Sequence, residues 1–177
     1  MRKVILYIAT SQDGFIARPD GDTAWLHGPG IELPGEDFGY GALMDRIDTT
    51  LMGRKTLEVI DGFDVPFPYA DKTNFAYSRA PQPAHAQVEW VGEPPAAHVR
   101  HLRAKPGKDI WLIGGASLFA DLADAGLVDE LILTEVPVVL GEGIPLFLRA
   151  EDRQAWEIQQ VREYPNGVKQ TFARWRL

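Results

Sequence analysis

Hydrophobic and polar positions follow two rhythms along this chain, one typical of strands and one typical of helices. Short apolar runs bounded by turn residues predict strands at 4–9, 49–53, 72–78, 86–91, 109–115 and 128–141. Apolar residues at helical spacing predict helices at 38–47, 54–60, 94–105 and 116–125. Strands and helices therefore alternate through most of the chain.

The C-terminal part has a different pattern. Residues 156–164 and 168–177 each alternate apolar and polar side chains, and Asn166-Gly167 between them is a strong hairpin signal. Alternating strands and helices predict a mostly parallel, twisted α/β sheet covered on both faces, to which the hairpin adds an antiparallel edge. Because no linker-like composition break interrupts the pattern, we expect residues 1–177 to form one domain.

Composition excludes several classes of protein. The chain has no cysteine, which excludes disulfides and a cysteine-based zinc site, and its net charge of -7 argues against a nucleic-acid partner. The apolar run at 4–9 is too short for a signal peptide or a membrane span, so a cytoplasmic protein without a membrane partner is expected. His98 and His101 have no further ligand at metal-binding spacing, and no metal site is predicted.

Ligands of open α/β sheets bind beyond the carboxyl ends of the strands, so the residues that follow each strand carry the candidate chemistry. Gly53 would let the backbone approach a ligand, and the helix that follows would offer free N–H groups to a phosphate beside Arg54 and Lys55. The alternative is a plain glycine turn with two solvated basic residues. Ser78 and Arg79 end the next strand and could flank the same phosphate if the two strands are neighbours.

Gly114-Gly115 repeats this arrangement between a strand and the helix that begins near Ala116. A pyrophosphate could lie against that helix start, and the alternative is an ordinary tight turn. Neither turn matches the full G-x-G-x-x-G fingerprint, so the argument for a phosphate site depends on both of them together.

Two acidic residues have open interpretations. Asp37 follows a long Gly- and Pro-rich loop and opens a predicted helix, where it could be a helix cap or a partly buried acid that binds a planar substrate and supports protonation. Asp13, before Gly14, is either a turn residue or part of a ligand-binding loop. Aromatic residues around the long loops could be core anchors or an apolar slot for a ring-shaped ligand; they are Trp25, Phe38, Tyr40 and Phe67.

Taken together, the segments "IATSQDGFIA", "DFGYGALMDRIDTTLMGRKTLE", "YSRA", "DIWLIGGASLF" and "GLVDELILTEVPVVLGEGIPLF" resemble the dihydrofolate reductase-like superfamily. The closer similarity is to the branch that contains the reductase domain of riboflavin synthesis, and it covers nearly the whole chain. The resemblance implies a sheet of about eight strands with flanking helices and a C-terminal antiparallel hairpin. It also implies an NADPH site and a homodimer that uses the C-terminal strands.

The resemblance assigns a role to each matching position. The residues implied to bind the cofactor are Ala9, Asp13, Gly14, Ile16, Gly53, Arg54, Lys55, Thr56, Ser78, Arg79, Gly114, Gly115, Ala116, Ser117 and Leu118. Asp37 falls on the single pocket carboxylate of folate reductases and is the implied catalytic residue, with Thr134 supporting it. Trp25 and Phe38 complete the substrate-binding set.

Some positions depart from the folate reductase pattern. Glu32 stands where folate reductases have a tryptophan, Lys72 aligns with the arginine that grips the folate tail, and no deaminase motif is present. The expected function is an NADPH-dependent reductase that passes hydride to a small planar heterocycle, either a dihydrofolate-like pterin or a 5-amino-6-ribosylaminopyrimidine-like compound. The alternative is a protein that binds or sequesters NADPH without significant turnover.

Overall fold

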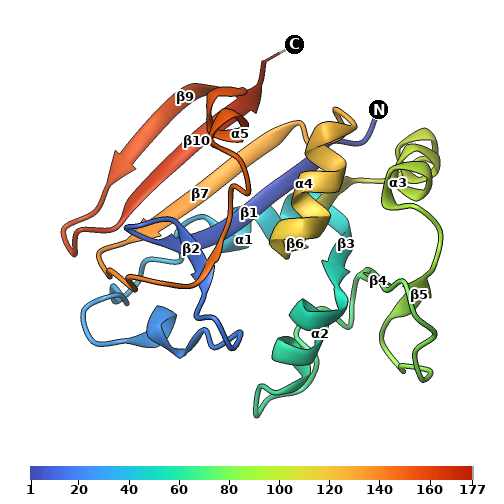
Figure 1. The fold of residues 1–177 in the computed structure, drawn as a ribbon, viewed down its shortest axis with the longest axis horizontal. Helices are drawn as coiled ribbons and strands as arrows, with labels where there is room; N and C mark the ends of the chain where they lie inside the picture. The colour runs from blue at the N-terminus through green and yellow to red at the C-terminus, as the bar shows by residue number, and fades with distance from the viewer. Residues whose placement is uncertain (177) are drawn as a thin grey trace.

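An eight-stranded sheet runs through the molecule in the order β5-β4-β3-β6-β1-β7-β10-β9 (Figure 1). The computed structural model describes residues 1–176. The strands of this sheet are β1 (Val4–Ser11), β3 (Ile47–Gly53), β4 (Thr73–Tyr77), β5 (Glu89–Val91), β6 (Asp109–Gly114), β7 (Glu130–Val136), β9 (Trp156–Glu163) and β10 (Lys169–Trp175). All neighbouring strands are parallel except the β7-β10 and β10-β9 pairs. The predicted parallel sheet with an antiparallel edge is therefore confirmed.

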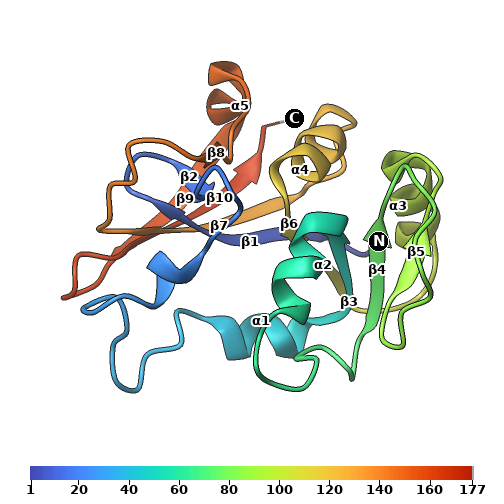
Figure 2. The ribbon, with the colours of Figure 1, turned by 60° about the horizontal axis from the view of Figure 1, so that its bottom comes forward.

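Helices cover both faces of this sheet. They are α1 (Tyr40–Arg46), α2 (Arg54–Asp61), α3 (Pro95–Ala104), α4 (Ala116–Asp124) and α5 (Ala150–Gln154). Buried residues of α1 and α2 pack in one hydrophobic cluster and those of α3 and α4 in another, on opposite sides of the sheet (Figure 2). Within residues 1–176, no helix has the length and apolar character needed to cross a membrane.

The central strands are apolar on both faces because both faces are covered. Val4, Ile5 and Leu6 of β1 have no exposed surface, although successive side chains point to opposite sides. At the opposite extreme, β9 is an edge strand, and all of its residues after Trp156 are exposed. The sheet is therefore well buried at β1 and β6 and open to solvent at β9.

Several boundaries differ from the sequence prediction for local physical reasons. The helix predicted at 38–47 begins at Tyr40, because Gly39 before it adopts a left-handed conformation with φ of +83°. The strand predicted at 128–141 ends at Val136, because Pro137 has no N–H group for the ladder. The final strand was predicted to reach Leu177, which lies outside the described residues.

Four short elements were not predicted. The long loop contains a 3-10 turn, η1 (Ala24–His27), and β2 (Phe15–Ala17) pairs with β8 (Ile144–Pro145) in a small second sheet. Helix α5 is the fourth. Each is only two to five residues long, too short for hydrophobic periodicity to be visible.

Candidate cofactor and substrate site

The two glycine turns that were predicted to bind phosphate lie against each other. Gly53 ends β3 before α2, and Gly114-Gly115, joined by a cis peptide bond, connect β6 to α4. A Cβ atom placed on Gly53 would lie 3.6 Å from the backbone nitrogen of Gly115. Because β3 and β6 are parallel neighbours, both turns lie at the carboxyl edge of the sheet, where ligands of such folds bind.

Among residues 1–176, no side chain caps the start of α2 or of α4, the two helices at this edge. Gly53 is the N-cap of α2 and Gly115 is the N-cap of α4, and neither first turn contains an acidic residue. The first N–H groups of a helix have no partner within the helix, and they can therefore bind an anion. Two such helix starts in contact suit a group with two phosphates.

The backbone shows which glycine the fold itself requires. Gly114 has a φ of +144°, which L side chains rarely adopt. Gly115 has an ordinary φ of −89°, and a Cβ atom on it would meet the Thr56 hydroxyl at 3.6 Å, a normal contact. Nothing among the described residues excludes a side chain at Gly115, so the bare position leaves space that a ligand can occupy. The site fits a dinucleotide on this ground.

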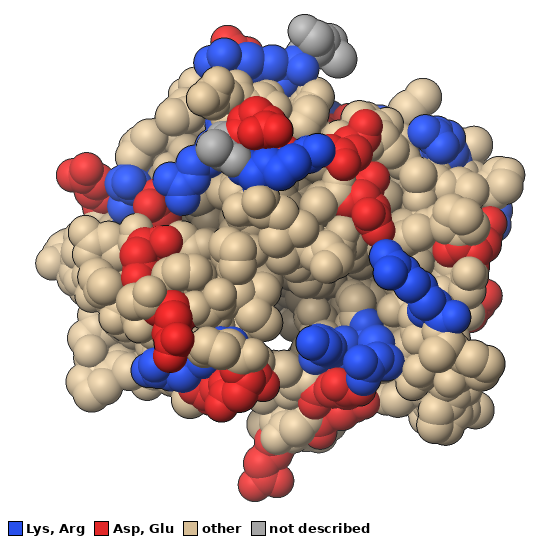
Figure 3. All heavy atoms as spheres, viewed as in Figure 1, with Lys and Arg blue, Asp and Glu red and all other residues tan. Residues whose placement is uncertain are grey.

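Basic side chains gather over the start of α2, at the margin of a hollow in the face shown in Figure 3. Arg54 and Ser78 directly follow β3 and β4, which are parallel neighbours, so the condition for a shared phosphate site is met. Arg54 forms an ion pair with Glu58 one turn along α2, whereas Lys55 and Arg79 are exposed. The structure thus brings together the positive charges that the sequence placed at two separate strand ends.

Asp13 holds the loop after β1 to the loop after β7. Its carboxylate accepts hydrogen bonds from the Ser11 hydroxyl at 2.6 Å, from the amide of Gly141 at 2.7 Å and from the amide of Leu140 at 3.1 Å. The Ser11 hydroxyl and these amides lower the pKa of Asp13. The carboxylate is therefore a loop anchor, and contact between this loop and a cofactor stays a prediction.

The remaining residues that were predicted to bind the cofactor differ in their exposure to solvent. The side chains of Ala116 and Leu118 are buried, so these residues can offer only backbone amides at the start of α4. Ser117, between them, is exposed. Ala9 is half-buried on β1, and Ile16 packs against the core beneath β2. Their assigned contacts with the cofactor stay predictions.

Asp37 is a helix cap in this structure. Its carboxylate is exposed and accepts hydrogen bonds from the amides of Gly39 and Gly41, both at 2.8 Å. The amides of Gly41 and Gly39 lower the pKa of Asp37, so the group is ionised at neutral pH and carries no proton to donate. Of the two interpretations of Asp37, the exposed carboxylate at the first turn of α1 fits the helix cap rather than the partly buried acid. Its catalytic role stays a prediction.

Thr134 bonds Gln170 in this structure, and its support of Asp37 stays a prediction. The Thr134 hydroxyl accepts a hydrogen bond at 3.0 Å from the side-chain amide of Gln170, which also donates to the carbonyl of Phe38 at 2.8 Å. Gln170 has no exposed surface, and its own carbonyl accepts a hydrogen bond from Tyr164. Thr134 is buried with Gln170, whereas the Asp37 side chain is exposed.

The network centres on Phe38, which has a φ of +53°. Its carbonyl accepts a second hydrogen bond from the Tyr7 hydroxyl at 3.2 Å, and its ring packs edge-on against Tyr164. A left-handed non-glycine residue persists where its surroundings determine it, and such residues concentrate at functional sites. Sequence reasoning missed Tyr7 and Gln170. Their signal was a polar side chain at an inward-facing strand position, where it must find a partner.

The four loop aromatics do not form one slot. Trp25 is 7% exposed and packs with Phe38 in a cluster beneath the long loop. Phe67 packs edge-on against Tyr69, and Tyr40 packs against Trp111, in a different cluster. The loop-anchor interpretation fits Trp25, which presents little surface to a ligand. Its substrate-binding role stays a prediction without support from this geometry.

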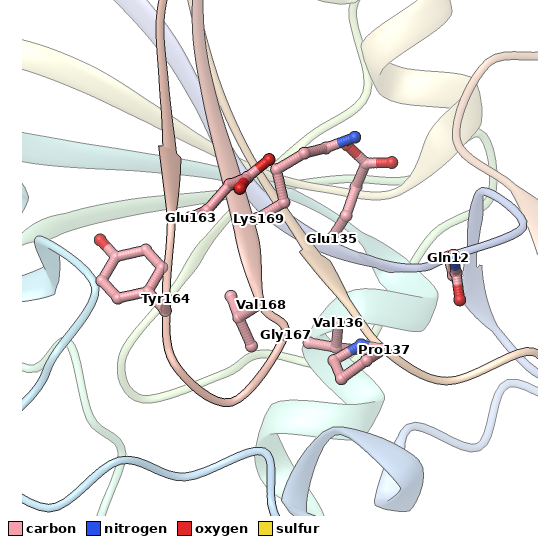
Figure 4. A pocket seen from close by; sticks show the side chains of 9 residues that line it. All are labelled: Gln12, Glu135, Val136, Pro137, Glu163, Tyr164, Gly167, Val168 and Lys169. Carbon is pink, nitrogen blue, oxygen red and sulfur yellow. The ribbon is translucent and has the colours of Figure 1, made fainter.

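A cavity of about 260 Å³ lies at the hairpin end of the sheet, away from the glycine turns (Figure 4). Lys169 and Glu135 form an ion pair at 3.0 Å on one side of it, and Tyr164 lines another side. A second cavity of about 310 Å³ lies between Gly14 and Arg153. Neither is lined by Gly53 or Gly115, and we place the candidate site at the glycine turns because the free amides and the basic charges meet there.

The strand order, the antiparallel final hairpin and the paired helix starts define a protein of the dihydrofolate reductase-like fold. The dihydrofolate reductase of Enterococcus faecalis, solved in complex with NADP(H), has this fold with a TM-score of 0.69 at 20% identity, over 97% of this chain and 96% of that one. The chain belongs to the RibD C-terminal domain family, whose model matches residues 72–170. The family and fold predicted from the sequence are therefore confirmed.

Two relatives match along nearly their entire length. The uncharacterized protein YwjB of Bacillus subtilis strain 168 is 35% identical over 175 residues, which cover 98% of each chain. A crystal structure from Shewanella sp. PV-4, of a protein named for riboflavin biosynthesis, has a TM-score of 0.87 at 29% identity and covers 99% of each chain. Membership of the RibD C-terminal domain family supports a reductase-type role and leaves the substrate open.

Proposed function

We propose that this protein is an NADPH-dependent reductase that transfers hydride to a small planar heterocycle. The observation that carries the proposal is the contact between two helix starts, at Gly53 and Gly115, that no described side chain caps. Membership of the RibD C-terminal domain family supports it, as does the shared fold of a reductase solved with NADP(H).

Different residues of the chain would bind different parts of NADPH. The amides that begin α2 and α4 would hold the diphosphate, and Arg54 and Arg79 would hold the adenosine 2′-phosphate. Ala9, at the carboxyl end of β1, would border the nicotinamide. NADPH, when bound, supplies hydride from C4 of its nicotinamide ring, and the protein supplies position and polarity.

Two measurements test this function. NADPH binding is followed by fluorescence titration, and NADPH oxidation is followed with dihydrofolate and with 5-amino-6-ribosylaminouracil phosphate. We expect tight NADPH binding and turnover of one of the two compounds. No NADPH binding would reject the cofactor assignment.

One observation favours a second candidate function. Asp37, the residue expected to assist protonation, is exposed and already bonded to two amides. A protein that binds NADPH without significant turnover would need no such acid. Tight NADPH binding with no turnover on any pterin or pyrimidine would support this alternative over the reductase.

A further inference from the structure

The Tyr7 hydroxyl has an unusual position on the face of the sheet that α1 covers. Tyr7 lies on β1 opposite Ile132 of β7, and Ala9 lies two residues further along the same face, opposite Thr134. Two residues of a strand span roughly 7 Å. Tyr7 is only half-buried, and its ring packs edge-on against Trp111 at 6.2 Å. Tyr7 therefore lies on the same face of the sheet as Ala9, the residue proposed to border the nicotinamide, and two residues from it along β1.

Two hydrogen bonds reach the Phe38 carbonyl, and the one from Tyr7 can break without leaving a buried group unpaired. The carbonyl of Phe38 receives two donors, Gln170 at 2.8 Å and Tyr7 at 3.2 Å. If the Tyr7 hydroxyl turns toward another acceptor, Gln170 still satisfies Phe38, so no buried group is left without a partner. Gln170 cannot turn in the same way, because it is fully buried and bonds Thr134 and Tyr164 as well.

The charges around Tyr7 keep its proton on the phenol. Burial raises the pKa of Tyr7, and the neighbouring Asp37 carboxylate raises it further. Tyr7 is therefore a neutral donor at every pH at which the protein would work. Such a donor suits an uncharged acceptor, such as a ring carbonyl or a ring nitrogen.

We propose that the Tyr7 hydroxyl is a substrate-binding and specificity-determining group that donates a hydrogen bond to a carbonyl or ring nitrogen of the planar heterocycle. The proton stays on Tyr7 throughout, so no covalent step passes through the residue. The inference rests on the proposed reductase function and assigns to Tyr7 the polar contact that the sequence had given to Asp37. Gln170 keeps the Phe38 backbone in place when Tyr7 turns to the substrate.

The test compares Tyr7→Phe with Tyr69→Phe in the full chain. Tyr69 is a matched control, because it is 8% exposed and its ring packs edge-on against the same Trp111, at 5.1 Å. Calorimetry measures the binding of dihydrofolate and of 5-amino-6-ribosylaminouracil phosphate to each variant saturated with NADP⁺. For the compound that the wild type binds, Tyr7→Phe should raise Kd roughly tenfold, the effect of one lost hydrogen bond. NADPH affinity should change less than twofold in both variants.

The outcomes separate this inference from the function on which it rests. Wild-type binding and turnover with an unchanged Kd in Tyr7→Phe would overturn the role of Tyr7 and leave the reductase proposal standing. Equal losses in Tyr7→Phe and Tyr69→Phe would also overturn it, because packing on Trp111 would then explain both. If the wild type binds neither compound, both proposals fail together.

Discussion

Two adjacent glycines in this chain are glycines for different reasons. Gly114 is required by its backbone, since its φ of +144° suits no other residue well. Gly115 is under no such constraint, and a Cβ atom there meets only an ordinary contact with Thr56. At the residue scale, the proposed cofactor beside Gly115 would explain why this position carries no side chain.

Gly115→Val should weaken NADPH binding roughly 100-fold while the protein stays folded, because the side chain would cover the free amides of α4 and remove about two hydrogen bonds to phosphate. Fluorescence titration measures the Kd, and circular dichroism checks the fold. Ala104→Val, which adds bulk at an exposed helix end, is the control. Unchanged NADPH affinity in Gly115→Val would place the cofactor elsewhere.

At the scale of elements, ion pairs at the amino edge of the sheet tie a helix to two strands. Arg46 ends α1 and bonds Asp109 of β6 at 2.9 Å and Glu130 of β7 at 3.0 Å. Glu130 also bonds Lys3 at 2.7 Å. Exposed pairs contribute little alone, but a network around a carboxylate whose side chain is 15% exposed contributes more.

Glu130→Gln should reduce stability at pH 7 by about 0.5–1 kcal/mol, and the difference should disappear in acid. Burial raises the pKa of Glu130, but hydrogen bonds from Lys3 and Arg46 outweigh it and lower the pKa. Because the folded pKa lies below the unfolded value of about 4.3, the stabilisation is present above that pH and is lost as the pH falls through the folded pKa. Urea unfolding at pH 7 and near pH 3 measures it, with exposed Glu142→Gln as the control. The same difference at both pH values would contradict the network.

The edge strand β9 carries a second prediction at this scale. Ile158 is 63% exposed and Val161 is 46% exposed, which is unusual for apolar residues on an edge strand. The family resemblance implies a homodimer that uses the C-terminal strands. Light scattering should give the mass of two chains for the wild type and of one chain for Ile158→Lys with Val161→Lys. The control is Leu148→Lys, at another exposed apolar site, and a dimer that survives the β9 changes would move the interface elsewhere.

At the scale of the whole molecule, the basic residues near the candidate site contrast with the negative net charge. The net charge is -7, yet basic residues follow both β3 and β4 where these strands lie side by side. An anionic cofactor can bind an acidic protein where basic residues gather locally. The dinucleotide NADPH differs from NADH by one phosphate, which makes this cluster testable.

Arg54→Ala with Arg79→Ala should raise the Kd of NADPH about 10- to 100-fold and that of NADH less than about threefold, since charged hydrogen bonds to the 2′-phosphate are lost. Titration with both cofactors measures the ratio, and the change of exposed Arg174 on β10 to Ala is the control. Equal losses for NADPH and NADH would show that the cluster serves another purpose.

The sequence by itself determined the longer strands and helices, the parallel sheet with its antiparallel edge, and the two glycine turns. These features follow from side-chain periodicity and backbone conformation, which act between residues close in the chain. Only the tertiary structure decided the partners of the polar side chains. Gln170 bonds Phe38 across 132 positions and Thr134 across 36, and no local pattern could have matched them. Asp37 had two possible roles in the sequence, and in the fold its exposed carboxylate bonds the amides of Gly39 and Gly41 at the start of α1.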